Sequence, residues 1–259
     1  MIESLHSPHI ARVKALISSR GNKERAAHGE FIAEGLQCAR EAFTATQGPG
    51  VKTIYLTESG KSRIDQAGLD ISNAEAVMVS EPVMAAMSST ITPQGIISIC
   101  SVADHEFSEL KPSGKSRFIY LHEIQDPGNA GTILRSADAM GIDAVIVSPG
   151  SVDMYSPKVV RATAGSLWHV PLFTGVTLAQ LSQQLPDVVK FALSAQGSKS
   201  LLEVKDLPDV VAIFGNEARG IDALIDADVL QVSIPMNGNA ESLNLAAAAA
   251  IVIFHLSHN

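Results

Sequence analysis

The sequence predicts an α/β protein with two domains, the second built on a parallel β-sheet that is covered by helices on both faces. Its 259 residues exceed the roughly 100 to 150 residues of a common single domain. After residue 117, continuous apolar strands alternate with helical segments, which is typical of a buried parallel sheet. A polar segment with Pro112 and Gly114 precedes that region. We therefore expect a first domain at 1–103, a linker at 104–116 and a second domain at 117–259.

The first domain is predicted to be a smaller α/β unit. Ser7 and Pro8 are suited to begin a helix, as cap and first helical residue, and Gly21 ends it. Apolar residues at helical spacing give that helix one buried face. A short strand and turn follow at 31–35, and strands are expected at 53–56, 76–79 and 96–102. Helices are expected at 36–46, 61–67 and 82–87.

The second domain is predicted to contain five strands, separated by helical segments. The strands are expected at 118–121, 144–147, 190–193, 210–214 and 230–234. In parallel sheets, ligands bind beyond the carboxyl ends of the strands. The loops after these strands are therefore the places where a functional site is expected.

Composition indicates a folded protein outside the membrane. The chain is 46% apolar and 18% charged, which is typical of a globular protein with buried cores. No apolar run reaches the roughly 18 to 20 residues of a membrane span, and the amino terminus lacks an apolar stretch of signal-peptide length. We therefore expect a cytoplasmic protein. Cys38 and Cys100 are interpreted as ordinary buried thiols, and no residue cluster has the spacing of a metal site.

Charge is distributed unevenly along the chain. The net charge of −8 argues against a protein that holds nucleic acid over its whole surface, but not against a local basic patch. Residues 1–117 carry 12 Lys and Arg against 13 Asp and Glu, whereas the remainder carries 7 against 14. The most basic stretch is the amino terminus, with Arg12, Lys14, Arg20, Lys23 and Arg25. Taken alone, such a cluster is typical of a solvated helix face.

Three segments that follow predicted strands carry glycines and polar side chains suited to a ligand site. Residues 126–137 form a turn that caps a helix bearing Arg135. Residues 215–222 form a glycine-containing turn that lacks both the dinucleotide fingerprint and the phosphate-loop ending, which argues against a nucleotide-binding oxidoreductase. Residues 233–246 contain a Gly/Asn loop and then a helix for which Ser242 is the expected cap. Singly, the segments are a capped helix, a turn and a buried helix.

Together, in this order on three strand ends, the segments closely resemble the three signature motifs of the SpoU/TrmH family within the SPOUT superfamily. Asn129–Ala137 matches N-x-G-x-x-x-R-[ST]-A, Gly215–Gly220 matches G-x-E-x-x-G, and Ile234–Asn244 matches I-P-M…S-L-N. This resemblance covers essentially the whole second domain. The first domain is more loosely similar to the substrate-binding domain of rRNA-modifying members, through its basic first helix, Phe31–Gly35 and Thr92–Ile97.

The resemblance implies an S-adenosylmethionine-dependent methyltransferase that acts on ribose 2′-hydroxyls of RNA. It also implies a deep trefoil knot in the carboxyl-terminal segment, a homodimer and no metal. The implied cofactor contacts are Gly215, Ile234 and Leu243, with Met236 and Gly220 as neighbours. The resemblance also strengthens the prediction that the basic amino-terminal cluster contacts RNA.

Arg135 matches the family's catalytic arginine. A guanidinium holds its proton firmly and is a reluctant base, so we expect it to stabilise the developing alkoxide electrostatically. The other polar matches are expected to orient this arginine, the ribose and the knot loops; they are Asn129, Glu217, Ser242 and Asn244.

Two related interpretations remain open. A tRNA ribose methyltransferase would use the same chemistry, although the separate first domain favours rRNA. A catalytically inactive RNA-binding member of the same fold would not need the set of polar residues just named, and their presence argues against it.

Overall fold

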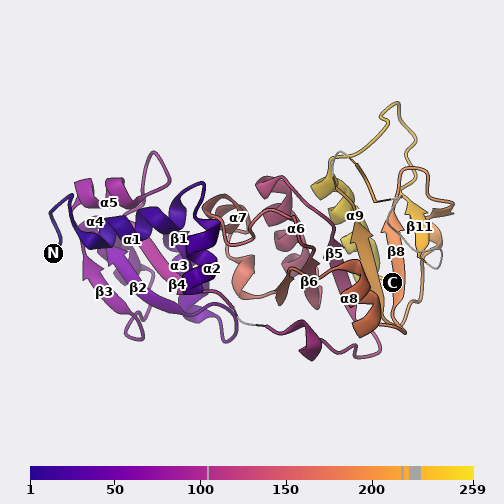
Figure 1. Ribbon diagram of the computed structural model, residues 1–259, viewed down its shortest axis with the longest axis horizontal. Helices are drawn as coiled ribbons and strands as arrows, with labels where there is room; N and C mark the ends of the chain where they lie inside the picture. Colours follow the sequence, from indigo (N-terminus) through magenta and orange to yellow (C-terminus); the bar gives the residue numbers. More distant parts are fainter. Residues whose placement is uncertain (104, 217–218, 222–228) are drawn as a thin grey trace. The chain divides into compact units, whose positions relative to one another are not determined.

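The computed structural model describes residues 1–103, 105–216, 219–221 and 229–259 and divides the chain into two compact units (Figure 1). The first unit comprises residues 1–104 and 153–169, and the second comprises 105–152 and 170–259. The sequence-based division placed everything after residue 116 in one domain. It therefore differs from the structure at the connection 153–169, which packs within the first unit.

The first unit contains a four-stranded sheet in the order β1-β4-β2-β3. The β1–β4 and β4–β2 pairs are antiparallel, and the β2–β3 pair is parallel. The strands are β1 (Glu30–Glu34), β2 (Val51–Leu56), β3 (Glu75–Met78) and β4 (Ile96–Ser101). The helices are α1 (Pro8–Ile17), α2 (Asn22–His28), α3 (Leu36–Thr44), α4 (Glu58–Gln66), α5 (Glu81–Met87) and α7 (Pro157–Ala162).

Helices cover both faces of this sheet because its apolar residues alternate along each strand. Tyr55 packs in a core with residues of α1 and α5, whereas its neighbours Ile54 and Leu56 pack with residues of α3 and α4. Ser7 caps α1 as predicted, since its hydroxyl accepts a hydrogen bond from the His9 amide.

The connection 153–169 packs on β1 through its aromatic residues. Tyr155 and Trp168 lie against Phe31, with ring centroids 5.0 and 6.1 Å away. Trp168 is buried, and its indole N–H donates to the Pro49 carbonyl at 2.8 Å. A buried tryptophan with its polar atom paired ties this segment firmly to the first unit.

The second unit contains a seven-stranded parallel sheet in the order β7-β6-β5-β10-β8-β11-β9. Its strands are β5 (Arg117–Leu121), β6 (Ala144–Val147), β7 (Leu172–Thr174), β8 (Val189–Leu193), β9 (Lys199–Ser200), β10 (Val210–Phe214) and β11 (Leu230–Ser233). The predicted α/β class with a parallel sheet and helices is confirmed. The short strands β7 and β9 were not predicted, because two or three residues are too few to form a recognisable apolar run.

Three helices pack on this sheet, namely α6 (Pro127–Ala139), α8 (Leu178–Gln184) and α9 (Leu245–Ser257). Leu181 of α8 lies in one core with Ile213 of β10. The next residue, Phe214, instead lines a pocket with Ala248 of α9. Because successive strand residues point to opposite faces, α8 and α9 cover opposite faces of the sheet. α6 packs beside α9.

None of the helices among the described residues is long and apolar enough to span a membrane. Cys38 and Cys100 are both buried and unbridged, as interpreted from the sequence. Burial raises the pKa of the Cys38 thiol to about 11, which keeps it protonated at neutral pH. Within the described ranges, no group of three or more His, Cys, Asp or Glu is placed to hold a metal ion.

Candidate functional site

A pocket of about 390 Å³ lies at the carboxyl ends of β8, β10 and β11, next to the amino-terminal ends of α6 and α9. This is the edge of a parallel sheet where ligand sites are expected. The pocket collects residues from all three predicted loops. Eight residues predicted for the site line it: Asn129, Gly215, Gly220, Ile234, Met236, Ser242, Leu243 and Asn244.

Among the described residues predicted for the site, Arg135 is not part of the pocket lining. Arg135 lies on α6, the helix that also carries Asn129, and its side chain is exposed. Glu217 lies outside the described residues.

The loop after β10 depends on two glycines. A side chain at Gly215 would bring its Cβ within 2.5 Å of the Gly220 carbonyl carbon and 2.7 Å of the Ile221 nitrogen. Gly220 has a φ of +63°, a left-handed conformation that favours glycine. Reciprocal backbone hydrogen bonds join Asn216 and Gly220, at 2.9 and 3.2 Å. The loop therefore folds back on itself and presents backbone to the pocket.

Asn244 joins the third segment to the first. Its side-chain oxygen accepts hydrogen bonds from the amides of Ala246 and Ala247, at 2.9 and 3.2 Å, so Asn244 is the cap of α9. The prediction that Ser242 caps this helix is wrong, because the helix begins at Leu245. The Asn244 amide nitrogen donates to Oδ1 of Asn129 at 3.0 Å. One side chain thus starts α9 and holds α6 beside it.

The start of α6 is fixed by Asp126, as the sequence predicted. The Asp126 carboxylate accepts a hydrogen bond from the Asn129 amide at 2.7 Å and caps the helix. Ile133, Leu134 and Ala137 are fully buried, which fixes the helix against the sheet and leaves Arg135 on its outer face.

Three pocket residues at the end of β8 and just after it were not predicted, namely Leu193, Ser194 and Ala195. The strand itself was predicted, so the strand-end rule could have indicated them. They carry no motif of their own, and that is why they were not singled out.

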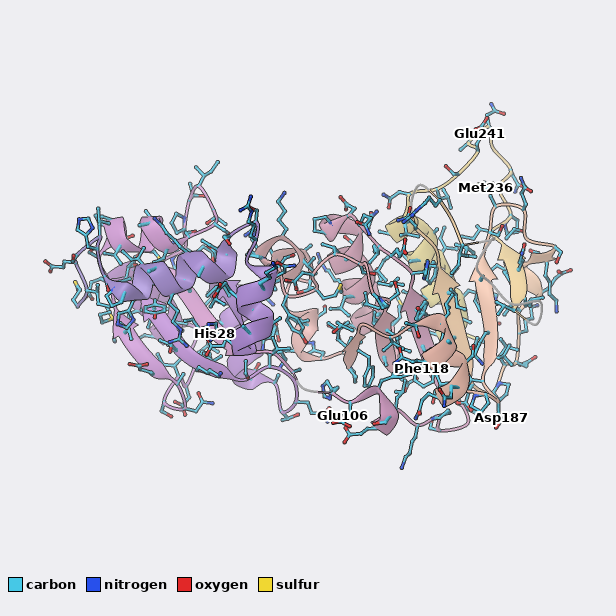
Figure 2. The ribbon with its side chains drawn as sticks, viewed as in Figure 1. His28, Glu106, Phe118, Asp187, Met236 and Glu241 are labelled. Carbon is cyan, nitrogen blue, oxygen red and sulfur yellow. The ribbon has the colours of Figure 1, made fainter. Side chains whose placement is uncertain are left out.

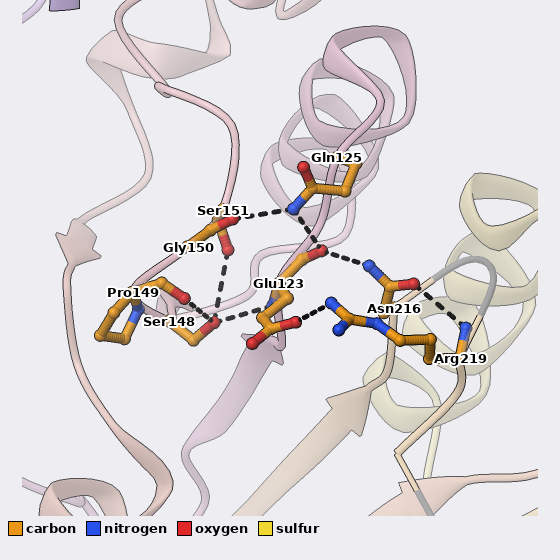
Figure 3. Close-up of polar contacts among 8 residues, drawn as sticks. All are labelled: Glu123, Gln125, Ser148, Pro149, Gly150, Ser151, Asn216 and Arg219. Atoms are coloured by element: carbon orange, nitrogen blue, oxygen red, sulfur yellow. Dashed lines mark hydrogen bonds and ion pairs between the residues drawn. The ribbon is translucent and has the colours of Figure 1, made fainter.

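A polar network beside the pocket joins the loops after β5, β6 and β10 (Figure 3). The Glu123 amide donates to Ser148 Oγ at 2.7 Å, and the Glu123 carbonyl accepts from Asn216 Nδ2 at 2.8 Å and Gln125 Nε2 at 3.0 Å. The Glu123 carboxylate pairs with the Arg219 guanidinium. Neither Glu123 nor Arg219 was predicted as a site residue.

His122 precedes Glu123 in the chain and lies next to this network. Burial lowers its pKa below the ordinary value of 6.5, an effect that Glu123 opposes and Arg219 reinforces. The imidazole stacks on the buried Tyr120 ring, with centroids 6.4 Å apart. His122 is therefore neutral at physiological pH.

The third segment is exposed between β11 and α9. Figure 2 shows Met236 and Glu241 on this loop. Met236 is 39% exposed although it lines the pocket. This loop therefore forms an open wall of the pocket.

The predicted basic residues of the first unit have different surroundings. Lys14, Arg20 and Lys23 are exposed. Arg12 is also exposed, but its guanidinium donates to both carboxylate oxygens of Glu30 at 2.8 Å.

Arg25 is 4% exposed, and its guanidinium bonds Asp153 and the Leu16 carbonyl. The prediction that Arg25 contacts RNA conflicts with this burial. A long cationic side chain in a basic stretch can face inward when the fold supplies an acidic partner.

Two family models match the chain over the two regions described above. The SpoU rRNA Methylase family matches residues 116–254, and the MRM3-like substrate binding domain matches residues 10–98. The first match spans more than half of the chain.

Full-length relatives agree with these matches. The chain is 30% identical to the 23S rRNA (guanosine(2553)-2′-O)-methyltransferase RlmP of Bacillus subtilis (strain 168), covering 98% of this chain and 99% of that protein. The crystal structure of an AdoMet-bound rRNA methyltransferase from Sinorhizobium meliloti is similar with a TM-score of 0.86 and 27% identity, covering 99% and 97% of the two chains. A solved RNA 2′-O ribose methyltransferase is similar with a TM-score of 0.81 and 27% identity, covering 98% and 97%.

Proposed function

The chain belongs to the SpoU rRNA methylase family, and from this premise we propose that it transfers a methyl group from S-adenosylmethionine to a ribose 2′-hydroxyl of ribosomal RNA. One observation carries the proposal: eight residues predicted from three separate motifs line a single pocket at the carboxyl edge of the parallel sheet. Ribosomal RNA is supported by the similarity to RlmP, which extends over both units.

The pocket suits a ligand of the cofactor's size and chemistry. Its volume of about 390 Å³ lies within the roughly 300 to 1,000 Å³ of small-molecule sites. Gly215, Ile234 and Leu243 would hold the cofactor by backbone and apolar contact, with Met236 and Gly220 beside them. When bound, S-adenosylmethionine supplies an electrophilic methyl group on a positively charged sulfur.

The residues of this chain then have to position and activate the acceptor hydroxyl. An arginine side chain is a permanent cation in proteins, so Arg135 stabilises negative charge that develops on the ribose oxygen. The Asn129–Asn244 hydrogen bond fixes α6 relative to α9 and thereby places the helix that bears Arg135. We assign Glu217 and Ser242 to orienting the arginine and the ribose.

The carboxyl-terminal segment is proposed to form the knot and the dimer interface of the family. Support for the dimer comes from α9, which is apolar almost throughout yet leaves one stripe of residues exposed. Ala247, Ile251 and Phe254 lie at helical spacing on this stripe, and the last two are 42% and 54% exposed. An apolar helix with an exposed apolar stripe is expected to pack against a partner.

RNA capture is proposed for the first unit, through Lys14, Arg20 and Lys23, which are exposed. Arg12 retains partial exposure beside Glu30 and joins this set. The acidic balance of the chain after residue 117 supports such a division of labour, with the first unit binding RNA and the second holding the cofactor. A ribosomal RNA substrate also fits the cytoplasmic location expected from the sequence.

The proposal is tested with purified protein, S-adenosylmethionine and unmodified transcripts of the ribosomal RNAs. Calorimetry should show cofactor binding, and Arg135→Ala should retain it while losing methyl transfer by about 100-fold or more. Lys205→Ala removes an exposed charge before β10, away from the carboxyl edge of the sheet, and should behave as wild type. Wild-type transfer rates in Arg135→Ala would contradict the assigned role, and absence of cofactor binding would contradict the function.

A further inference from the structure

Arg219 is an exposed cation next to the pocket that the proposed function has not used. It lies between Asn216 and Gly220, both of which line the pocket, and its side chain is 71% exposed. We propose that Arg219 binds a phosphate of the acceptor RNA, and that Glu123 holds its guanidinium at the mouth of the pocket. This inference rests on the proposed function, because it takes RNA as the substrate.

The backbone at Arg219 is fixed relative to the pocket. The Arg219 amide donates to Oδ1 of Asn216 at 3.1 Å, and the amide nitrogen of the same Asn216 side chain donates to the Glu123 carbonyl. The hydrogen bonds between Asn216 and Gly220 close the loop on either side of the arginine. The base of the side chain therefore keeps a constant position beside the cofactor pocket.

Glu123 provides a rigid partner for the guanidinium (Figure 3). Its backbone adopts a φ of +47°. Its amide donates to Ser148, and its carbonyl accepts from Gln125 and Asn216, so these hydrogen bonds hold the backbone there. The Glu123 side chain is 33% exposed and is therefore more buried than the Arg219 side chain. A guanidinium carries five N–H donors, so one edge can bond Glu123 while other donors remain for a phosphate.

The chemistry of the substrate explains why a cation is useful here. A ribose 2′-hydroxyl in RNA lies beside the 3′-phosphate of the same nucleotide, so any pocket that receives this hydroxyl also receives a phosphate nearby. Arginine is the residue best suited to planar, bidentate phosphate contacts. An exposed ion pair contributes little to stability, so the Glu123–Arg219 pair is better explained by orientation than by folding.

Two other cations of the second unit are engaged near the amino-terminal ends of the strands. Arg117, at the start of β5, donates to the carbonyls of Pro208 and Leu256. Lys190, near the start of β8, donates to the carbonyls of Leu185 and Val188. Arg219 instead stands at the carboxyl edge, where the acceptor must approach.

Arg219→Ala tests the proposal through RNA affinity and its salt dependence. Loss of one charge-assisted contact should weaken binding of the ribosomal RNA transcripts about tenfold. The slope of log affinity against log salt concentration should become shallower by about 0.7 to 0.9, the amount expected for one phosphate contact. Affinity for S-adenosylmethionine should stay at the wild-type value. Lys205→Ala, the matched loss of one charge away from the pocket, should leave all three quantities unchanged.

Glu123→Gln tests the holding role. Any change it causes in RNA affinity should disappear when Arg219 is already alanine, because the carboxylate acts through the guanidinium. An unchanged salt slope in Arg219→Ala, or a loss of cofactor affinity in place of RNA affinity, would overturn the proposal. Failure of the wild-type protein to bind or methylate RNA would instead overturn the proposed function, so the two failures can be told apart.

Discussion

Replacing Asn244 should lower both the stability of the second unit and the rate of methyl transfer. The contacts of its side chain predict how large the loss of stability is. In Asn244→Ala, α9 loses the side-chain cap on the Ala246 and Ala247 amides, which costs about 1 kcal/mol. The exposed hydrogen bond to Asn129 is also lost and costs about 0.5 kcal/mol. The second unit should therefore lose about 1.5 kcal/mol. Asn244→Ser keeps a capping hydroxyl but is too short to reach Asn129, so it should lose only about 0.5 kcal/mol.

The measurement is urea unfolding followed by two signals. The chain has one tryptophan, Trp168, and it belongs to the first unit, so its fluorescence reports on that unit and should not change in either variant. Far-ultraviolet circular dichroism also reports on α9 and should show the loss. Both variants should reduce methyl transfer, since both release α6 from Asn244. Equal destabilisation by alanine and serine would refute the capping role, and full activity in the serine variant would refute the role of the Asn129 contact.

Three further predictions concern the first unit and the assembly. Arg25→Ala should destabilise the first unit by about 2 to 3 kcal/mol, because it leaves Asp153 without its buried partner. Urea unfolding followed by tryptophan fluorescence measures this loss, and an unfolding midpoint equal to that of the wild type would contradict it. Glu30→Gln should be less stable than wild type at pH 7, and the difference should shrink in urea titrations as the pH falls below 4.5, the ordinary pKa of this carboxyl. Burial raises the pKa of Glu30, but hydrogen bonds to the carboxylate outweigh that effect, so its folded-state pKa is depressed and its contribution is lost on protonation; a difference independent of pH would contradict this. Phe254→Asp should convert a dimer to a monomer in light scattering, whereas Leu5→Asp, an exposed change in the first unit, should not; a dimer that survives Phe254→Asp would place the interface elsewhere.

The regular part of the fold could be predicted because the strands of a buried parallel sheet are continuous apolar runs. The predicted strands at 144–147 and 210–214 coincide with β6 and β10. The connection 153–169 could not be assigned in this way, since its aromatic residues do not reveal which sheet they pack on. Only the structure shows Trp168 bonding Pro49 of the first unit.

Residues of the pocket lining were predicted where they belong to a recognisable motif, and were not predicted where only their position in the fold brings them to the pocket. Glycines and polar residues of the three motifs indicated most of the lining. The cap of α9 was assigned to Ser242 because serine is a common cap, but Asn244 is an equally good one and lies at the true helix start. Glu123 and Arg219 are 96 residues apart, and nothing in their local sequence indicates that they meet.

The central claim is that the acceptor is a ribose 2′-hydroxyl, and one comparison tests it directly. Once the modified nucleotide has been located by mass spectrometry of the methylated transcript, two oligonucleotides are made around it, identical except that one carries a 2′-deoxy sugar at that nucleotide. Transfer of a labelled methyl group from S-adenosylmethionine should occur on the ribose form and be absent from the deoxy form, with both oligonucleotides binding the protein. Equal methylation of the two would contradict the claim, because the methyl group would then reside on the base.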